Sequence, residues 1–495
     1  MSNNNDTVSE TSKTTIDKAI ENAHAVFQEY KQVKTAERIL FLQNIAAEIN
    51  AIKPLLIEVT QRETYLPTAR LEGELLRTTN QINLFANLLQ EGSWVKAVID
   101  IKQDPPSDIR QMQIPLGVVA VFGASNFPYA FSVAGGDTIA ALAAGCPVVY
   151  KSNPAHPQTS VMVAACIKKA AEKTGIPQHV FSIVYGASHQ VGLHLVMHPL
   201  ITAVAFTGSF NGGKALYDAA AKRKTPIPVY AEMGSVNPIF VLPEIMQQQA
   251  TVVAEKIIAS NLQGVGQFCT NPGLVILTEY AGTDNFVEAS AALISKTNAG
   301  SMLTENIHQA YSSGVKKLAE KETLHLAAQG LSTVAPQAAV PHLFVTDAAN
   351  FLTDENLQEE VFGPSSIFIK AADKAALFNI VNHLHGQLTA TVWGTDNDLA
   401  EYATLIQLLE EKAGRLIINN VPTGVEVTAA MVHGGPFPAT TYSGATSVGT
   451  GSIYRFTRPV CYQGFPQFLL PGALKNENPL KIWRLVNGSP STENI

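Results

Sequence analysis

The sequence predicts an α/β protein with two doubly wound units, and three observations lead to this class. From Gly117 onward, short apolar runs alternate with helical stretches, as in buried parallel strands joined by helices. Before that point, from Ile16 to about Glu91, apolar residues recur every three or four positions, which predicts helices. At 495 residues the chain exceeds the size of one hydrophobic core, so we expect about two or three domains.

The N-terminal part is predicted to be a short tail followed by helices and a hairpin. Residues 1–14 are rich in Asn, Ser and Thr and predict a frayed tail. After the helical pattern, residues 104–108 are rich in Asp, Pro and Ser and lie between two alternating segments. This arrangement predicts a hairpin-like insertion at about residues 96–114.

Two series of strands are expected after the hairpin. The first contains a strand at Val118–Gly123, a helix at Gly135–Ala144, a strand at Pro147–Tyr150, a helix at Thr159–Lys173 and strands at Phe181–Tyr185 and Ile201–Phe206. The second contains strands at Pro238–Leu242, Gly273–Leu277, Ser366–Ile369 and Arg415–Asn419. The apolar runs after about Tyr454 lack a helical period, and we interpret this section as an assembly arm. The expected division is a tail at 1–14, domains at 15–235 and 236–440, and a return segment with the arm at 441–495.

Composition excludes several classes of function. The formal net charge of −7 disfavours nucleic acid or an anionic membrane as the main partner. The four cysteines are far apart, without a CxxC pair or a histidine cluster at ligand spacing, so we expect a reducing compartment, no disulfide framework and no metal site. The N-terminus has no apolar signal region and no apolar run approaches a membrane span of about 18 residues. The sequence therefore predicts a cytoplasmic protein.

One cysteine lies in a context typical of a nucleophile. Cys269 follows the glycine-rich segment Gln263–Phe268, and glycines let other backbone or a flat cofactor ring come close. A thiolate is the strongest natural nucleophile near neutral pH. The alternative is a cysteine that packs as a small hydrophobe, which is what we expect of Cys146, Cys166 and Cys461.

Further motifs recur in a fixed order along the chain. They are Gly123-Ala-Ser-Asn-Phe-Pro128, Lys151-Ser-Asn-Pro154, Phe206-Thr-Gly-Ser209, Glu232-Met-Gly-Ser235, the Cys269 segment and Glu360-Val-Phe-Gly-Pro364. Gly208 and Gly213 have the spacing of the outer pair of a dinucleotide fingerprint, but the middle glycine is missing, so this motif alone is weak. Together the motifs resemble the NAD(P)-dependent aldehyde dehydrogenase superfamily over roughly residues 15–480. The resemblance implies a Rossmann-type cofactor domain, an α/β catalytic domain and a small β oligomerisation arm.

Four other motifs are similar to one branch of this superfamily. They are Phe131–Thr138, Pro154–Pro157, Met431–Pro436 and Arg458–Gln463. The branch contains α-ketoglutaric semialdehyde (2,5-dioxovalerate) dehydrogenases and some NADP-linked long-chain aldehyde dehydrogenases. The resemblance therefore implies oxidation of 2,5-dioxovalerate to 2-oxoglutarate, with a long-chain or broad-range aliphatic aldehyde as the alternative substrate. A non-catalytic protein that retains the fold is the alternative from another class.

The resemblance assigns three catalytic roles. Cys269 would attack the aldehyde to form a thiohemiacetal, which becomes a thioester after oxidation. Asn126 would stabilise the oxyanion with its side-chain amide, although an asparagine after a strand is also a common turn residue. Glu232 would activate water to hydrolyse the thioester if burial brings its pKa toward the working pH. A solvated or salt-bridged glutamate is the alternative for Glu232.

The resemblance also assigns the cofactor residues. Lys151 would bind the adenosine ribose, Gly208 and Ser209 the pyrophosphate at a helix start, and Glu360 the nicotinamide ribose with Phe362 beside it. Phe122, Ser125 and Gly234 complete the expected cofactor site.

Two departures from the common pattern bear on these roles. NAD-preferring members often carry a glutamate three residues after the lysine, where this chain has Pro154. Nothing acidic there repels a 2′-phosphate, so we expect NADP to be tolerated alongside NAD. The common Gly-Gly-Lys is Gly234-Ser235-Val236 here, and the sequence alone offers no physical reason for this change.

The expected partners are a small aldehyde and further copies of the chain, as a homodimer or homotetramer. Phe127, Phe131 and Phe268 are candidates to line the substrate tunnel. A substrate that carries a carboxylate would require a cation at the tunnel mouth, for which Arg455 and Arg458 are candidates by position.

Overall fold

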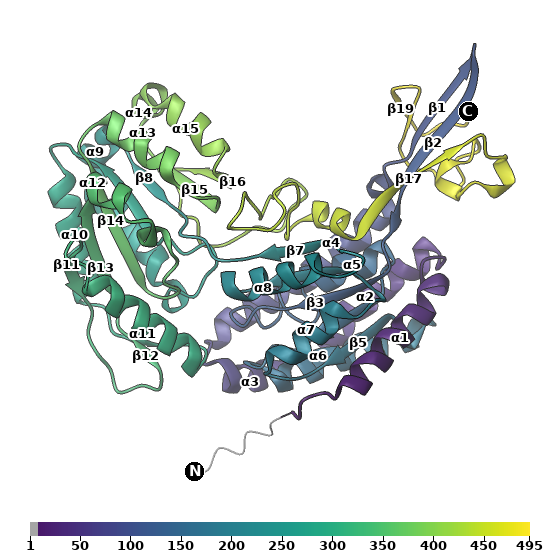
Figure 1. Ribbon diagram of the computed structural model, residues 1–495, viewed down its shortest axis with the longest axis horizontal. Helices are drawn as coiled ribbons and strands as arrows, with labels where there is room; N and C mark the ends of the chain where they lie inside the picture. The colour runs from purple at the N-terminus through teal and green to yellow at the C-terminus, as the bar shows by residue number, and fades with distance from the viewer. Residues whose placement is uncertain (1–7) are drawn as a thin grey trace.

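The chain forms two sheets of mainly parallel strands and a small mixed sheet that projects from the body. The structure is a computed structural model that describes residues 8–495. We name the three parts the N-terminal sheet (strands within 118–232), the C-terminal sheet (strands within 239–418) and the arm (strands within 98–115 and 457–491). Figure 1 shows the two sheets with their helices next to each other, with the arm at the end farthest from the C-terminal sheet.

The N-terminal sheet has five parallel strands in the order β5-β4-β3-β6-β7. Their bounds are β3 Val118–Phe122, β4 Val148–Lys151, β5 Phe181–Val184, β6 Ile201–Thr207 and β7 Val229–Glu232. The central strand β3 is buried along its whole length, because helices cover both faces of a doubly wound sheet.

Alternate side chains of β3 enter two different cores. Val119 and Val121 pack in a cluster with helices α2 to α6, whereas Val118 and Ala120 pack with α1, α7 and α8. This division follows from the two-residue period of a strand. The helices are α1 Lys13–Tyr30, α2 Thr35–Ala51, α3 Lys53–Thr64, α4 Thr68–Glu91, α5 Gly136–Ala144, α6 Pro157–Thr174, α7 His189–Met197 and α8 Phe210–Ala221.

The C-terminal sheet has seven strands in the order β11-β13-β14-β9-β8-β15-β16, and only the edge strand β11 runs antiparallel to its neighbour. The strands are β8 Ile239–Val241, β9 Leu274–Thr278, β11 His325–Gln329, β13 His342–Asp347, β14 Ser365–Ala371, β15 Gln387–Trp393 and β16 Ala413–Ile418, with a separate pair β10 Gly300–Ser301 and β12 Ala338–Ala339. The helices are α9 Pro243–Leu262, α10 Thr283–Ser295, α11 Glu305–Ala319, α12 Ala348–Thr353, α13 Lys374–His383, α14 Asp396–Glu401 and α15 Ala403–Glu410. A separate hydrophobic core holds this part together.

The arm joins the predicted hairpin to the end of the chain. Its order is β17-β2-β1-β18-β19, with β1 Val98–Gln103, β2 Pro106–Pro115, β17 Thr457–Gln463, β18 Arg484–Val486 and β19 Ser489–Ser491. Before β17, the short 3-10 helix η5 Thr450–Phe456 inserts Ile453 and Phe456 into the core beside the N-terminal sheet. The last section of the chain thus returns to the N-terminal part.

Every strand and helix named from the sequence exists, with ends shifted by one or two residues. Strands β7, β11, β13 and β15 were not predicted. In β15 the run Gln-Leu-Thr-Ala-Thr-Val-Trp is buried at every position, so its polar residues hide the usual apolar signal of a central strand. The expected packing of Cys461 is wrong, because its side chain is exposed on β17 of the arm. Cys146 and Cys166 are buried, as expected.

The N-terminal tail differs in part from the expectation for residues 1–14. Residues 1–7 lie outside the described part of the chain, whereas Lys13 and Thr14 already belong to α1, which Ser12 caps by accepting from the Thr15 N–H. Within the described residues, no single helix has the length and apolarity to cross a membrane, and α2 with α3 passes that test only as a pair bent by 72°.

Candidate active site

The predicted residues of the N-terminal sheet gather at the carboxyl ends of its strands. Phe122 ends β3 and lies opposite Lys151 at the end of β4. Glu232 ends β7, and Gly208 and Ser209 lie between β6 and α8. In doubly wound sheets ligands bind in the crevice at this edge, so the strand register brings these residues to one side of the sheet.

The backbone before Cys269 has an unusual conformation that explains its glycines. In the short 3-10 helix η3 Gln263–Gly266, three consecutive residues are left-handed: Gly264 (φ 58°), Val265 (φ 58°) and Gly266 (φ 66°). A β carbon at Gly266 would collide with the backbone of Gly363. The prediction that these glycines permit a close backbone approach is therefore confirmed.

Asn237 holds the cysteine loop from beneath. Its Nδ2 donates to the carbonyl oxygens of Cys269 and Asn271, both at 2.9 Å. The residue itself is buried and left-handed, with φ 46°, a conformation that asparagine tolerates better than most residues. The Cys269 main chain is thus tied to the segment between β7 and β8.

The structure gives a physical reason for the Gly234-Ser235-Val236 departure. The Ser235 hydroxyl donates to Oε1 of Gln387 at 2.8 Å and accepts the backbone N–H of Leu388 at 3.0 Å, so it joins this turn to β15. Val236 is buried in the C-terminal core, where a lysine ammonium would lose its hydration. The serine supports the turn, and the valine fits its apolar surroundings.

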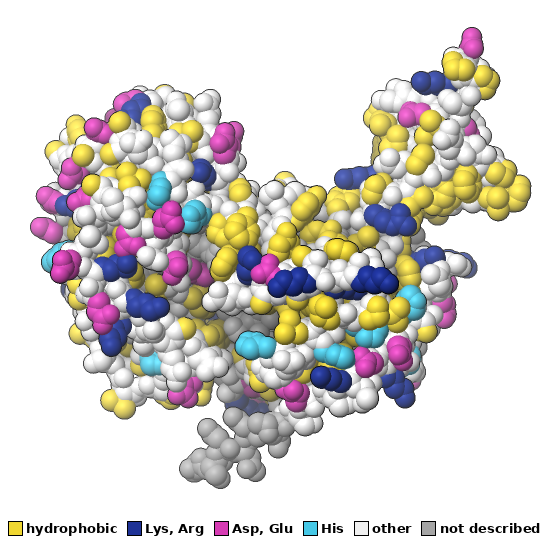
Figure 2. Space-filling model, viewed as in Figure 1, with side chains coloured by type: hydrophobic (Ala, Val, Ile, Leu, Met, Phe, Trp, Pro, Cys, Tyr) yellow, Lys and Arg dark blue, Asp and Glu magenta, His cyan; other side chains and the backbone are white. Residues whose placement is uncertain are grey.

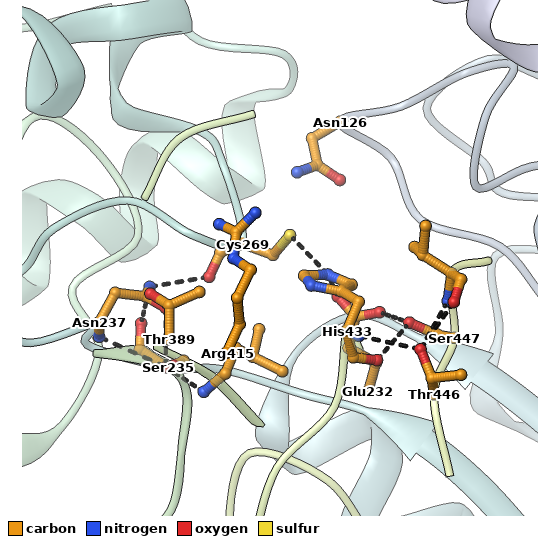
Figure 3. A network of polar contacts seen from close by, with 12 residues as sticks. Asn126, Glu232, Ser235, Asn237, Cys269, Thr389, Arg415, His433, Thr446 and Ser447 are labelled. Carbon is orange, nitrogen blue, oxygen red and sulfur yellow. Dashed lines mark hydrogen bonds and ion pairs between the residues drawn. The ribbon is translucent and has the colours of Figure 1, made fainter. Parts of the chain in front are cut away.

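A histidine connects the candidate nucleophile to the candidate base. Nε2 of His433 lies 3.4 Å from Sγ of Cys269 and 2.9 Å from Oε1 of Glu232. The Ser447 hydroxyl donates to the other carboxylate oxygen of Glu232 at 2.5 Å. Figure 3 shows the chain of contacts from Cys269 through His433 to Glu232 and Ser447. The sulfur of Cys269, a ring nitrogen of His433 and a carboxylate oxygen of Glu232 all lie within 4.8 Å of one another. The three side chains are therefore close enough to exchange protons.

The surroundings shift the pKa values of two of these groups in opposite directions. Burial, reinforced by the Glu232 carboxylate, raises the pKa of the Cys269 thiol well above its ordinary value. Burial also favours a higher pKa for Glu232, but the charge of His433 and the hydrogen bonds from His433 and Ser447 outweigh it, and the net pKa is lowered. Near neutral pH the site therefore holds a protonated thiol beside an ionised carboxylate.

In Figure 3 the side chain of Asn126 lies on the side toward which the Cys269 sulfur points. Its Nδ2 donates to the carbonyl oxygen of Gln267 at 2.9 Å, two residues before the cysteine. An amide nitrogen carries two N–H groups, so the second can serve an oxyanion that forms on a carbon bound to Cys269. The geometry is compatible with the expected role.

Three aromatic rings that were expected to line the substrate path are in contact. Phe127 makes edge contacts with Phe131 and Phe268, with ring centroids 5.2 Å and 5.4 Å apart. The Phe131 ring centroid lies 6.1 Å from that of His433. The aromatic cluster therefore adjoins the reacting sulfur through the histidine.

Three structural features involve the residues that were assigned to the cofactor. Ser209 caps α8 by accepting the Gly212 N–H at 3.3 Å, and the free N–H groups of a helix start favour a phosphate. A β carbon at Gly234 would collide with the Glu360 carboxylate, so the glycine leaves room for that side chain. Glu360 and Phe362 line the same cavity as Ser235. Ser125 lies beside Asn126 in the loop after β3.

The two arginines that were expected to meet a substrate carboxylate are placed elsewhere. Arg455 is buried and its Nη2 lies 2.7 Å from the Asp137 carboxylate, so its charge is already paired. Arg458 is exposed on β17, in the arm. Neither adjoins Cys269, and this expectation is corrected.

The sequence motifs contained His433 without indicating its role. The segment Met431–Pro436 contains no helix or strand. His433 and Glu232, at the end of β7, are 201 positions apart in the chain, so no local pattern reveals that they meet. Ser447 was missed for the same reason. A single histidine in a motif near a predicted nucleophile was the available signal.

Comparison with known proteins places the chain among enzymes. Residues 2–437 match the model of the aldehyde dehydrogenase family. The chain is 47% identical over 482 residues to an alpha-ketoglutaric semialdehyde dehydrogenase of Acinetobacter baylyi, covering 96% of this chain and 91% of that protein. It is 46% identical to alpha-ketoglutaric semialdehyde dehydrogenase 2 of Azospirillum brasilense, covering 96% and 91%.

Solved structures share the fold at lower identity. A putative aldehyde dehydrogenase from Burkholderia cenocepacia superposes with a TM-score of 0.77 at 22% identity, covering 92% of this chain and 93% of that one. A glyceraldehyde-3-phosphate dehydrogenase GapN from Methanocaldococcus jannaschii, complexed with NADP, gives 0.78 at 20% identity, covering 92% and 95%. These similarities extend over nearly the whole fold.

Proposed function

The chain belongs to the aldehyde dehydrogenase family and oxidises an aldehyde with NAD(P)+; from this premise we propose that its substrate is α-ketoglutaric semialdehyde (2,5-dioxovalerate) and its product 2-oxoglutarate. The observation that carries the substrate is the near-full-length similarity to two enzymes with that name, at 46–47% identity. The geometry of Cys269, His433 and Glu232 supports the chemistry.

In the first step Cys269 loses its proton and attacks the aldehyde carbon. The raised pKa of the thiol means that a base must assist. His433 is placed to stabilise the thiolate, because its Nε2 bonds the Glu232 carboxylate at 2.9 Å and faces the sulfur at 3.4 Å, so that its N–H and its charge act on both groups. The thiol proton itself leaves to water.

The attack converts the carbonyl oxygen into an alkoxide. The free N–H of Asn126 and the backbone N–H of Cys269 are the donors that we assign to this oxygen. The hydrogen bond from Asn126 to Gln267 fixes the amide plane before substrate arrives, so no reorganisation is needed at that moment.

Oxidation and hydrolysis follow. NAD(P)+, held by Lys151, Ser209 and Glu360, would supply the oxidation as a hydride acceptor, and loss of the hydride from the thiohemiacetal carbon leaves a thioester on Cys269. Glu232 then removes a proton from a water molecule, which attacks the thioester and releases the carboxylate and the free thiol. The ionised state of Glu232, caused by its lowered pKa, lets it accept that proton.

The N-terminal segment bears on the choice between NAD+ and NADP+. Glu10 accepts from the Ser188 hydroxyl at 2.8 Å, and its charge acts on Lys151, whose pKa burial lowers. Thr11 accepts the Tyr185 N–H at 2.8 Å and so fixes this segment beyond β5. We propose that Glu10 supplies the carboxylate that Pro154 lacks, so that NAD+ is preferred and NADP+ is tolerated.

A panel of aldehydes tests the substrate. Steady-state kcat/KM for 2,5-dioxovalerate should greatly exceed that for hexanal with either cofactor. A large excess for hexanal would favour the second candidate, a long-chain or broad-range aliphatic aldehyde dehydrogenase. The contact of Phe127 with Phe131 and Phe268 is the observation that supports this second candidate.

Replacement of the nucleophile tests the catalytic reading itself. The Cys269→Ala variant should lose turnover and still bind NAD(P)+, as measured by fluorescence titration. Unchanged turnover would remove Cys269 from the mechanism and would leave the non-catalytic alternative in place.

We propose that the enzyme assembles as a homodimer or homotetramer through the arm. Figure 2 shows hydrophobic side chains gathered on the arm. Its exposed large hydrophobic residues include Ile109, Phe465, Phe468, Leu469, Leu480, Trp483 and Leu485. Apolar patches of this kind mark interfaces. The Phe468 side chain is 79% exposed, and the oligomeric mass of the Phe468→Asp variant, measured by light scattering, tests the assignment.

A further inference from the structure

Arg77 is a partly buried arginine whose hydrogen bonds are incomplete. It lies in α4, and its Nε donates to the carbonyl oxygen of Val425 at 3.4 Å. Its Cζ lies 5.1 Å from the centre of the Phe131 ring. Its Nη1 is shielded from solvent and has no hydrogen-bond partner among the described residues. A guanidinium N–H that is buried without an acceptor is costly, so an acceptor is expected there.

The charge of Arg77 is also not paired. Among the described residues, no carboxylate lies within ion-pair distance of it, whereas Arg70 in the same helix bonds Glu74 at 2.6 Å. The other Glu74 oxygen accepts the backbone N–H groups of Tyr129 and Ala130, so both Glu74 oxygens are already engaged by donors other than Arg77. Burial lowers the pKa of Arg77, and the charges of Glu74, Cys269 and Glu232 oppose that shift.

The position of Arg77 connects it to the reacting sulfur. The Phe131 ring beneath its guanidinium has its centroid 6.1 Å from that of His433, and Nε2 of His433 lies 3.4 Å from Sγ of Cys269. Phe131 and Val425 belong to one apolar cluster. The cluster comprises Ala124, Ala130, Phe131 and Val448 with Phe127, Val425, Val427 and Met431 packed against it. Arg77 therefore places a positive charge beside this apolar cluster, which adjoins the nucleophile.

We propose that Arg77 binds the carboxylate of the substrate at the end opposite the aldehyde, and that it makes the enzyme selective for aldehydes that carry an acid group. A guanidinium fork matches a carboxylate with two parallel hydrogen bonds, and Nη1 is an N–H donor that lacks an acceptor. The carbon chain between the two groups would lie on the aromatic rings while the aldehyde reaches Cys269. This inference rests on the proposed oxidation of an aldehyde acid and names the residue that recognises it.

Arg415 is the other arginine whose charge acts on Cys269, and it fits this role less well. Its Nη1 and Nη2 both donate to backbone carbonyl oxygens, those of Gly424 and Pro422. Only its Nε lacks a partner. Arg415 thus supports the loop at Pro422 and Gly424, next to Val425, which Arg77 contacts.

Substitution of Arg77 tests the proposal with paired substrates. We compare kcat/KM for 2,5-dioxovalerate, glutaric semialdehyde and pentanal in the wild type, Arg77→Met, Arg77→Lys and Arg458→Met. Arg77→Met should lower kcat/KM for both acids about 10- to 100-fold, mainly through KM, as expected for a lost charge-assisted hydrogen bond. The value for pentanal should change by less than about threefold. Arg77→Lys should lie between, because it keeps the charge and loses the fork.

Arg458→Met is the matched control, because it removes the same charge at an exposed site on the arm. Three results would each overturn the proposal. They are an equal loss of kcat/KM for the acids and pentanal in both Arg77 variants, no loss of kcat/KM for the acids, or a loss of kcat/KM for the acids in Arg458→Met instead. If Arg77→Met does not fold, as judged by circular dichroism, the acid-selective loss in Arg77→Lys decides. Inhibition by 2-oxoglutarate gives a readout without turnover, and its Ki should rise with the KM for the acids.

The wild type separates this inference from the proposed substrate. If it prefers glutaric semialdehyde to 2,5-dioxovalerate, and Arg77→Met lowers kcat/KM for both acids but not for pentanal, Arg77 keeps its role and the proposed substrate fails. If the wild type makes no distinction between acids and pentanal, both fail.

Discussion

Nε2 of His433 lies 2.9 Å from Oε1 of Glu232, and both side chains are almost fully buried although 201 positions separate them in the chain. The same Nε2 faces the Cys269 sulfur. An imidazole N–H that is held between a thiolate and a carboxylate leaves neither of the two buried charges uncompensated. This relationship is the basis of the first two predictions.

Replacing His433 should slow formation of the thiolate. Because burial raises the pKa of Cys269, loss of the imidazole that stabilises the thiolate in His433→Gln should lower kcat/KM about 10²- to 10⁴-fold near neutral pH and less at high pH, where hydroxide deprotonates the thiol. The pH dependence of Cys269 alkylation by iodoacetamide measures this directly. His24→Gln, on the exposed surface of α1, is the control. An alkylation profile equal to that of the wild type would assign His433 a structural role only.

Replacing Glu232 should separate acylation from hydrolysis. In Glu232→Gln the amide can still bond His433, so a rapid burst of reduced nicotinamide should remain. The steady rate after the burst should fall about 10²- to 10⁴-fold, because water loses its base. Rapid-mixing absorbance at the nicotinamide band measures both phases. A steady rate unchanged from the wild type would exclude Glu232 as the hydrolytic base.

Removing the amide of Asn126 should weaken transition-state stabilisation. Asn126→Ala should lower kcat about 10²- to 10³-fold, the usual cost of one oxyanion donor, with little effect on the Kd for NAD+. Steady-state kinetics and cofactor titration measure the two quantities. A loss confined to KM would point to substrate positioning instead.

Neutralising Glu10 should shift the cofactor preference toward NADP+. The carboxylate beside Lys151 repels a 2′-phosphate, so Glu10→Gln should raise the ratio of kcat/KM for NADP+ to that for NAD+ about threefold, a modest effect because the charges are partly solvated. High salt should diminish the difference between variant and wild type. Glu29→Gln, exposed on α1, is the control. An unchanged ratio would show that Glu10 does not influence the ribose site.

The ionisation of Glu360 should make stability depend on pH. Burial raises the pKa of Glu360 from 4.5 to about 8 in the folded chain. Between these values the folded chain holds a proton that the unfolded chain has released, so stability falls as pH rises toward about 8. The Glu360→Gln variant lacks this loss. The difference in Tm between the variant and the wild type, measured without cofactor, should therefore increase from pH 5 to pH 8 and then level off. A difference in Tm that does not change with pH would contradict the assignment.

Local pattern was sufficient for strands β3 to β6 of the N-terminal sheet and for the residues at their ends, but not for β7. Buried parallel strands such as Val118–Phe122 are short apolar runs, and the turn that follows each one must carry the residues at the carboxyl edge of the sheet. The glycines before Cys269 were also interpretable, since only a residue without a β carbon fits against Gly363. Strand β15, with its buried threonines, lacked that signal.

The sequence by itself determined the α/β class, the family resemblance, and Cys269, Glu232 and Asn126 as candidates, because each depends on residues that are close in the chain. Only the tertiary structure decided that His433 joins the thiol to the carboxylate, that Asp137 already neutralises Arg455, and that Arg77, beside the Phe131 ring, has no paired carboxylate among the described residues. The reason is physical: hydrogen bonding, charge pairing and desolvation depend on distances of a few ångströms between segments that lie hundreds of residues apart, and no local pattern encodes which of them meet.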